Sequence, residues 1–306
     1  MNQSGLPSVT VIVPSRGRAE LRARAVRSIL AQRYPGRIEC LVVFDGGDRV
    51  LPSVELAPGR TLTSIDNRRA PGLPAAARNT GALAARSELL AFCDDDDEWL
   101  PDKLRQQVAV LARSRDVSTV SCGIEVVYRD RLVTRVPKSR VTFDDLLRSR
   151  VAELHTSTLL VRRDDVLGRI GLFDEAMPGG YAEDYDWLLR AARTAPVLAV
   201  DKPLARIHWH ESSFFEGRWG TVVSSLPYLL EKHPFQRNRQ GLARIYGQLA
   251  FACAAADRPR DSLRWSTRTI RANWREPRAY LAVAVAAGVL RAETLLRVLH
   301  RFGRGI

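Results

Sequence analysis

The chain has 306 residues, of which 45% are hydrophobic and 26% charged, and this composition is typical of a soluble globular protein with one large domain or two. Its longest apolar stretch, at 279–290, is shorter than the roughly 20 residues that a membrane-spanning helix needs, and the chain opens without a secretory signal pattern. We therefore expect a cytoplasmic protein.

The cysteines and the charge distribution narrow the range of possible functions further. The four cysteines are scattered without a CxxC motif, which argues against a disulfide framework and against a structural zinc site. The net charge of +13 is uneven, because residues 216–306 hold 16 arginines and lysines against 6 aspartates and glutamates. Such a basic region binds anionic lipid, nucleic acid or an acidic partner, or keeps a protein in solution, and charge alone does not choose among these roles.

The first two hundred residues alternate short β-branched runs with stretches of helical period, which predicts an α/β fold with a largely parallel sheet. From the N-terminus we expect a strand at 9–13, a helix at 20–32, and strands at 38–44 and 61–65. Next we expect a helix at 74–85, a strand at 89–93, a helix at 101–113, a hairpin within 117–133 and a strand at 155–161.

After residue 208 the strands give way to arginine-rich stretches of helical period at 222–230, 242–256 and 263–274. We place a boundary near residue 216, between an α/β domain at 1–215 and a basic α-helical region at 216–306. The last stretch has the pattern of an interfacial helix on an anionic membrane, with Arg264, Arg268, Arg271, Arg275 and Arg278 beside Trp265 and Trp274. A solvated helix packed on the first domain explains this pattern equally well.

Four consecutive aspartates, Asp94 to Asp97, follow the apolar run at 89–93, where a buried strand is expected to end. Two carboxylates about 4 Å apart repel by roughly 4 kcal/mol at an effective dielectric near 20, so several ionised ones need a cation. A hard divalent metal fits, because Mg²⁺ takes one or two protein carboxylates and completes its shell with phosphates and water. The alternative is a solvated acidic loop or the first turn of the helix at 101–113.

A second acidic group, formed by Glu183, Asp184 and Asp186, precedes the apolar residues 187–189. A carboxylate placed beside a substrate hydroxyl acts as a general base, which an alcohol nucleophile needs at neutral pH. The alternative is that these acids stabilise the first turn of a helix through its dipole. The presence of both acidic groups in one chain favours catalysis.

Five segments occur in a characteristic order: VTVIVPSRGR at 9–18, VVFDGG at 42–47, ARNTG at 77–81, DDDDEWLP at 94–101 and EDYDWLLR at 183–190. Together they resemble the inverting family 2 of nucleotide-sugar glycosyltransferases over roughly residues 8–214. The resemblance implies a GT-A catalytic domain at 1–215, a Rossmann-like mixed and mostly parallel sheet flanked by helices. Gly47 departs from the family pattern, in which many members carry serine.

The resemblance assigns the nucleotide side of the site to residues near the ends of the first strands. Pro14, Arg16 and Asp45 line the nucleotide pocket, with the Asp45 carboxylate accepting hydrogen bonds from the base. Arg78 pairs with the donor diphosphate or braces the aspartates, and Asp95 faces the ribose. Asp45 as a turn former and Arg78 as a surface arginine are the open alternatives.

The resemblance also implies the metal ligands. Asp94 and Asp96 form the D-x-D pair that binds Mg²⁺ or Mn²⁺, and Asp96 is the surer ligand of the two. A histidine after the last core strand reaches the metal or the diphosphate, which points to His208, with His210 as the second choice. A histidine that only holds the loop explains His208 equally well.

By the same resemblance Asp184 is the base that takes the proton of the acceptor hydroxyl, with Glu183 as the other member of the catalytic acidic pair. The function that follows is metal-dependent, inverting transfer of a sugar in glycan or polysaccharide synthesis. The donor is a nucleoside-diphosphate sugar, and the acceptor is a saccharide or a lipid-linked molecule.

Two other functions remain open at this point. A nucleotidyltransferase or phosphotransferase also uses carboxylates and Mg²⁺, although the chain has neither a G-x-x-x-x-G-K-[ST] nor a G-x-G-x-x-G motif. A non-catalytic basic protein that binds membranes or nucleic acid explains the C-terminal charge but leaves both acidic groups without a role. We expect no nucleic-acid partner, because an acidic pocket repels polyanions, and we keep peripheral contact with the inner membrane face as an option.

Overall fold

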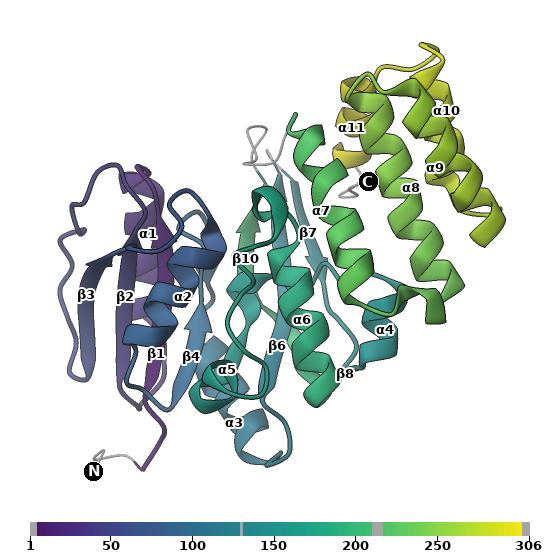
Figure 1. Ribbon diagram of the computed structural model, residues 1–306. Coiled ribbons are helices and arrows are strands. Elements are labelled where there is room, and N and C mark those ends of the chain that lie inside the picture. The colour runs from purple at the N-terminus through teal and green to yellow at the C-terminus, as the bar shows by residue number, and fades with distance from the viewer. Residues whose placement is uncertain (1–4, 129–130, 210–216, 302–306) are drawn as a thin grey trace. The chain divides into compact units, whose positions relative to one another are not determined.

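The computed structural model describes residues 5–128, 131–209 and 217–301, which fall into two compact units (Figure 1). Unit 1 comprises 1–143, 151–175 and 183–209, and unit 2 comprises 144–150, 176–182 and 210–306. The predicted boundary at residue 216 and the candidate His210 lie outside the described residues. The division at residue 216 therefore stays a prediction.

Unit 1 contains the strands and most of the shorter helices. Its strands are β1 (Val9–Ser15), β2 (Ile38–Phe44), β3 (Arg60–Asp66), β4 (Leu89–Phe92), β5 (Glu98–Trp99), β6 (Thr119–Tyr128), β7 (Arg131–Arg135), β8 (Arg140–Val141), β9 (Leu160–Arg162) and β10 (Val197–His208). Its helices are α1 (Ala19–Leu30), α2 (Pro74–Ala84), α3 (Lys103–Ala112), α5 (Arg163–Leu167) and α6 (Glu183–Thr194).

The strands form one mixed sheet in the order β3-β2-β1-β4-β9-β6-β10-β5, with β7 paired to β6 and β8 to β10. Strands β3, β2, β1 and β4 are parallel, and so are β6 and β10, while β9 runs antiparallel between β4 and β6. Because parallel strands end at the same edge, the residues after β1, β2 and β4 emerge side by side. This confirms the predicted α/β class and the mostly parallel half of the sheet.

Helices cover both faces of the sheet, which explains why its inner strands are apolar on both sides (Figure 1). Alternate β1 residues such as Val11 belong to the same core as Val26 of α1 and Val108 of α3. On the opposite face Gly81 of α2 lies against Ile12 of β1. Strands β1 and β2 are buried except for one partly buried residue in each, so their β-branched runs in the sequence were a reliable signal.

The predicted strand at 155–161 was wrong in its first half. Residues Thr156–Thr158 form a 3-10 turn, and the strand comprises only Leu160–Arg162. The His155 side chain accepts from the Ser157 backbone N–H at 3.3 Å, and the Thr158 hydroxyl donates to the His155 carbonyl at 2.6 Å. Such local bonds compete with strand pairing and hold the segment in a turn.

Unit 2 is helical in the part that the structure describes. Its elements are α4 (Phe143–Arg148), α7 (Trp219–Lys232), α8 (Arg239–Ala255), α9 (Pro259–Ala272), α10 (Pro277–Ala286) and α11 (Ala292–Arg301). Helix α8 packs against α9 and α10, with Phe251 and Ala282 in a common core. The three predicted C-terminal helices are confirmed as α7, α8 and α9. The predicted stretch at 242–256 ends one residue after α8, and the stretch at 263–274 ends two residues after α9.

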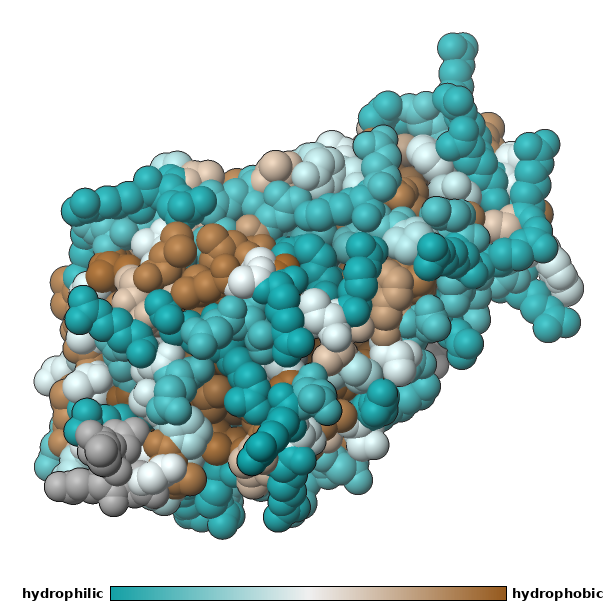
Figure 2. Space-filling view, turned by 60° about the horizontal axis from the view of Figure 1, so that its bottom comes forward, coloured by the Kyte–Doolittle hydropathy of each residue, from teal (hydrophilic) through white to brown (hydrophobic). Residues whose placement is uncertain are grey.

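None of the described helices has both the length and the hydropathy needed to cross a bilayer. On the face that Figure 2 presents, hydrophobic residues gather in patches that are surrounded by hydrophilic ones.

Gly81 is expected to control the fit of α2 on the sheet. A Cβ at this position would meet Ile12 Cγ2 at 2.5 Å and Val43 Cγ2 at 3.1 Å, so Gly81→Ala should lower the free energy of unfolding by about 1–3 kcal/mol. The matched control is Gly220→Ala in α7, where nothing lies within 4 Å and a gain of about 0.5–1 kcal/mol is expected. Urea denaturation measures both, and equal effects would contradict this account of the packing.

Candidate active site

One edge of the sheet gathers the predicted residues of unit 1. Asp45 follows β2 and hydrogen-bonds through its backbone N–H to the Ser15 carbonyl at 2.9 Å. Both oxygens of the Asp45 carboxylate are fixed, one by the Asn67 amide at 2.7 Å and the other by the Gly72 N–H at 2.7 Å. The predicted Asp45 is thus a rigid acceptor at the carboxyl end of β2, with a role in the turn as well.

Arg78 connects the two acidic groups that the sequence singles out. Its guanidinium donates to Asp94 Oδ1 at 2.7 Å and to Glu183 Oε1 at 2.9 Å. The Arg78 side chain is only 5% exposed and lies 5.4 Å from the centre of the Phe173 ring. Arg78 is therefore a buried bridge between the end of β4 and the start of α6, which favours bracing of the aspartates over an ordinary surface arginine.

The bridge accounts for unequal proton affinities at its two ends. Burial by itself raises the pKa of Asp94, but the charge of Arg78 and its hydrogen bond outweigh burial and lower that pKa below its usual value. Burial, together with the charge of Asp184, raises the pKa of Glu183 to about 7 in spite of Arg78. The Arg78 pKa is raised, because the two carboxylates outweigh the cost of burying the guanidinium.

Asp184 lies beside Glu183 in the first turn of α6 and differs from it in environment. Its side chain is half-buried, and Oδ1 accepts from the Tyr185 N–H at 2.7 Å. The acids of this turn lie at the positive end of the helix dipole, as the structural alternative requires. The Asp184 side chain is also less buried than that of its neighbour Glu183.

The middle aspartates have different partners. Asp95 is fully buried, accepts from the Ser15 hydroxyl at 2.8 Å and is paired with Arg18. Asp96 has a side chain that is 20% exposed and accepts from Arg18 Nη1 at 2.6 Å. Burial raises the pKa of Asp95 to about 6, although Arg18 and the Ser15 hydrogen bond act in the opposite direction.

Asp97, the last of the four aspartates, is buried and accepts hydrogen bonds from two other segments of the chain. Its carboxylate accepts from the Ser157 hydroxyl at 2.5 Å and from the His208 backbone N–H at 3.2 Å. Burial and the neighbouring charges of Asp96 and Asp94 raise the pKa of Asp97 well above its ordinary value. The His208 ring meets Glu98 Oε1 at 2.7 Å.

A group of possible metal ligands lies in this region. Among the described residues, Asp94, Asp97 and His155 each offer one ligand atom, and these atoms lie within 4.8 Å of one another. Two carboxylate oxygens and an imidazole nitrogen are donors that Mg²⁺ or Mn²⁺ accepts, so this set fits a divalent cation. It shares Asp94 with the predicted ligands, whereas Asp96 and His208 contact Arg18 and Glu98. The roles of Asp96 and His208 as ligands stay predictions.

Two of the predicted nucleotide-binding residues lie around the end of β1. Pro14 is the sixth residue of β1 and is half-buried, and Arg16 follows the strand and is exposed. A Cβ on Gly72, where φ is +84°, would lie 3.2 Å from the Arg16 guanidinium, so this glycine leaves room for the arginine. The chain thus places Arg16 next to the turn that fixes Asp45.

Sequence reasoning missed three contributors to the site. Arg18 lies within the motif at 9–18, but nothing local indicates that it reaches aspartates 77 and 78 positions away. His155 and Ser157 come from the turn that was predicted as a strand. The histidine and the hydroxyl were visible in the sequence, but their distance along the chain from the aspartates gave no signal.

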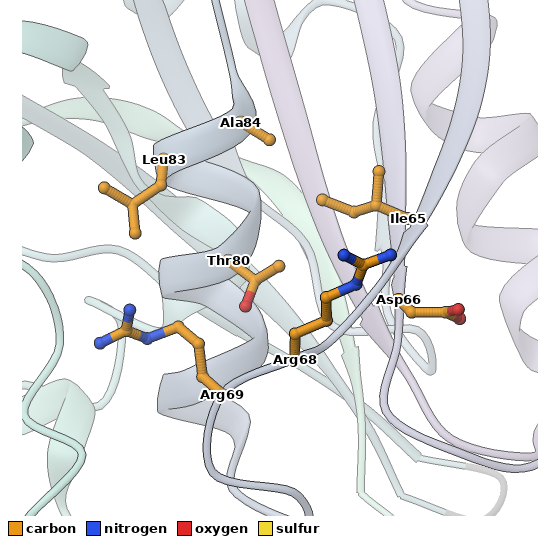
Figure 3. A pocket seen from close by; sticks show the side chains of 7 residues that line it. All are labelled: Ile65, Asp66, Arg68, Arg69, Thr80, Leu83 and Ala84. Carbon is orange, nitrogen blue, oxygen red and sulfur yellow. The ribbon is translucent and has the colours of Figure 1, made fainter.

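A cavity of about 510 Å³ lies between the end of β3 and α2 (Figure 3). Its walls are Ile65, Asp66, Arg68, Arg69, Thr80, Leu83 and Ala84. None of these is a predicted site residue. The Thr80 hydroxyl nevertheless donates to the Asn67 side chain at 2.9 Å, and Asn67 in turn holds Asp45. The cavity therefore adjoins the support of Asp45 and not the aspartate run.

Residues 10–166, just over half of the chain, match the model of glycosyl transferase family 2. The chain belongs to this family, which confirms the resemblance drawn from its motifs. It is 28% identical over 214 residues to an uncharacterized glycosyltransferase of Rickettsia typhi, with 67% of this chain and 65% of the relative covered.

A second relative is the UDP-Glc:alpha-D-GlcNAc-diphosphoundecaprenol beta-1,3-glucosyltransferase WfgD of Escherichia coli. It is 25% identical over 142 residues, which cover 46% of this chain and 55% of the relative. The chain thus spans less than two thirds of these relatives' lengths.

Two solved structures share the fold. TarS 1-349 of S. aureus, in complex with UDP-GlcNAc, matches with a TM-score of 0.60 at 16% identity, and the match covers 92% of this chain and 91% of the TarS chain. The mannosyltransferase PcManGT of Pyrobaculum calidifontis, in complex with GDP-Man and Mn²⁺, matches with a TM-score of 0.57 at 24% identity. That match covers 96% of this chain and 79% of the PcManGT chain. The GT-A type of fold is thereby confirmed.

The Arg78 bridge should be a major source of stability. Arg78→Met leaves the buried Glu183 and the partly buried Asp94 without their shared partner, so a loss of about 3–5 kcal/mol in the free energy of unfolding is expected. Adding Glu183→Gln should recover part of this loss. The control is Arg49→Met, which breaks the exposed pair with Asp66 and should cost less than about 1 kcal/mol. Equal losses in urea denaturation would show that the bridge is no stronger than a surface pair.

Proposed function

We propose that this protein is a metal-dependent, inverting glycosyltransferase that moves a sugar from a nucleoside-diphosphate sugar to a hydroxyl acceptor in glycan or polysaccharide synthesis. The observation that carries the proposal is the Arg78 bridge, which ties Asp94 of the aspartate run to Glu183, the neighbour of Asp184. Sugar transfer needs both parts: positive charge beside the leaving diphosphate, and a base beside the incoming alcohol.

The donor is proposed to lie along the carboxyl ends of β1 and β2. Asp45, held by Asn67 and Gly72, keeps lone pairs that accept from a nucleobase, and Asp95 faces the ribose. Pro14 forms the wall of the pocket, and Arg16 supplies a guanidinium for the phosphates. TarS and PcManGT, which have the same fold, were solved with UDP-GlcNAc and with GDP-Man.

A divalent cation is proposed to bind at the aspartate run through Asp94, with Asp96 in the role that the family motif gives it. Asp97 and His155 are further donors close to Asp94. When bound, Mg²⁺ or Mn²⁺ neutralises the diphosphate and so stabilises the charge that develops on the leaving group. The Arg78 guanidinium donates to Asp94 Oδ1 and lowers the pKa of Asp94, which favours the ionised form that a cation binds.

Asp184 is proposed to take the proton from the acceptor hydroxyl. Its carboxylate is more open than that of Glu183, which is 93% enclosed and already bonded to Arg78. Glu183, the other predicted member of the pair, thus orients Arg78 and the start of α6. Attack by the alcohol on the face opposite the leaving diphosphate inverts the anomeric centre. A lipid-linked saccharide is one proposed acceptor, since WfgD is named for a diphosphoundecaprenol substrate.

The base assignment is tested by Asp184→Asn. Sugar transfer should fall by about 10²–10⁴-fold in kcat, because a carboxamide does not accept the proton, while binding of the nucleotide sugar changes little. The control is Asp164→Asn on α5, where the carboxylate is 97% exposed and full activity is expected. A panel of nucleotide sugars is tested in the presence of Mn²⁺. Thermal shift measures binding of the nucleotide sugar, and release of nucleoside diphosphate measures turnover. Unchanged turnover of Asp184→Asn would refute the assignment.

Contact with an anionic membrane is proposed for unit 2, on the evidence of the exposed side of α9. Leu263 and Ile270, which are 50% and 38% exposed, are seven residues apart, so they lie on one stripe of α9, and Trp274, which is 64% exposed, follows the end of the helix. An adjoining stripe is basic and exposed. It consists of Arg260, Arg264, Arg268 and Arg271, and the exposed Arg275 follows the helix. Asp261, the acid within α9, is paired with Arg258 at 2.6 Å. Apolar and cationic side chains that adjoin in this way suit an anionic lipid surface.

Vesicle binding tests this contact. Replacing Arg264, Arg268, Arg271 and Arg275 by glutamine should weaken binding to vesicles of phosphatidylcholine with phosphatidylglycerol by roughly 10³-fold, at about 1 kcal/mol for each arginine. A control with the same change of charge replaces Arg33, Arg37, Arg86 and Arg113, which are exposed in unit 1. Cosedimentation that is equal for the two quadruple variants would reject a role of α9.

A further inference from the structure

One arginine of unit 1 pairs with Asp95 and with Asp96, the second of which the family motif assigns to a cation. Arg18 Nη1 donates to Asp96 Oδ2 at 2.6 Å, and Nη2 of the same guanidinium pairs with Asp95 Oδ1. Arg18 directly precedes α1, at the carboxyl end of β1, three residues after Ser15, whose hydroxyl binds the other oxygen of Asp95. The pairing thus joins the loop after β1 to the loop after β4.

Arg18 and Arg78 both contact the aspartate run, but they differ in their freedom to move. The Arg78 side chain is 5% exposed and contacts both Asp94 and Glu183, so its departure would leave the buried Glu183 and the partly buried Asp94 without this partner. The Arg18 side chain is 47% exposed and follows Gly17, whose φ of +68° lies in the left-handed region that favours glycine. Arg18 reaches water by rotating its side chain, whereas Arg78 does not.

A guanidinium and a divalent cation compete for one carboxylate. Both are positive, and they repel each other when they share the Asp96 carboxylate, so each weakens the binding of the other. If Asp96 is the metal ligand that the family motif indicates, binding of the metal there favours the release of Arg18. A released arginine next to a bound diphosphate finds a new bidentate partner there, because phosphate oxygens match the geometry of its N–H groups.

We propose that Arg18 is a positioning residue that competes with the divalent cation for Asp96 and moves onto the donor diphosphate when cation and donor bind together. The inference rests on the proposed function. In this account Arg18 neutralises Asp95 and Asp96 before donor binding and neutralises the diphosphate afterwards. A cation alone would then bind weakly, and a cation with a diphosphate would bind well.

The experiment compares Arg18→Gln with Arg27→Gln. Arg27 is exposed near the other end of α1, so the control removes the same charge from the same helix. Binding of Mn²⁺ alone is measured by the electron paramagnetic resonance signal of the free ion, and binding of pyrophosphate in excess Mn²⁺ by calorimetry. Arg18→Gln should bind Mn²⁺ alone about 10-fold more tightly than the wild type and pyrophosphate about 10-fold more weakly. Arg27→Gln should change neither affinity.

The opposite signs of the two effects separate this role from a purely structural one, which would weaken both affinities together. If Arg18→Gln binds Mn²⁺ no more tightly than a wild type that does bind it, the competition is refuted and the proposed metal dependence stands. If neither protein binds Mn²⁺, with or without pyrophosphate, the proposed function fails as well. Tighter Mn²⁺ binding with unchanged pyrophosphate binding would refute the move to the diphosphate.

A second variant keeps the test valid if Arg18→Gln does not fold. Arg18→Lys retains the positive charge beside Asp95 and Asp96 but loses the two-pronged geometry. Its Mn²⁺ affinity should stay within about twofold of the wild type, because the competing charge remains, while pyrophosphate binds more weakly. A Mn²⁺ affinity of Arg18→Lys that rises tenfold would contradict competition by charge.

Discussion

A single buried guanidinium shared by the buried carboxylate of Glu183 and the partly buried carboxylate of Asp94 organises the candidate site. Arg78 comes from α2, Asp94 from the end of β4 and Glu183 from the start of α6, so the bond pattern exists only when all three elements are in place. Removing charged groups from water costs several kcal/mol for each ion, and only complete pairing offsets that cost. The position of Asp184 beside Glu183 therefore depends on the same interaction.

The aspartate run shows how surroundings give different properties to identical side chains. Asp94 faces Arg78 and has a lowered pKa, whereas Asp95 and Asp97 are enclosed and have raised ones. Asp96 lies near the surface and contacts the exposed side chain of Arg18. Burial, neighbouring charge and hydrogen bonding thus divide four adjacent carboxylates between holding the loop and binding ligands.

The role of unit 2 is inferred from the residues on its own surface. The match to the family model ends at residue 166, before the helices α7 to α11 begin. On α9 the buried residues are Ser262, Ser266 and Thr269, whereas the arginines, Leu263 and Ile270 are exposed, which departs from the usual pattern of a helix that contributes to a core. This surface is suited to a partner with negative charge and an apolar interior, and a lipid bilayer has both.

Most of the local elements, and the family, could be predicted from the sequence alone. The β-branched runs predicted β1 and β2, because a strand buried on both faces needs a continuous apolar run, and the motif around Asp94 placed the acids after β4. Only the tertiary structure decided which groups meet: Arg18 with Asp96, His155 near Asp94 and Asp97, and Arg78 with Glu183. These contacts join residues between 58 and 105 positions apart, and a sequence pattern reports on neighbours within a few turns, not on the packing that brings distant loops to one edge of a sheet.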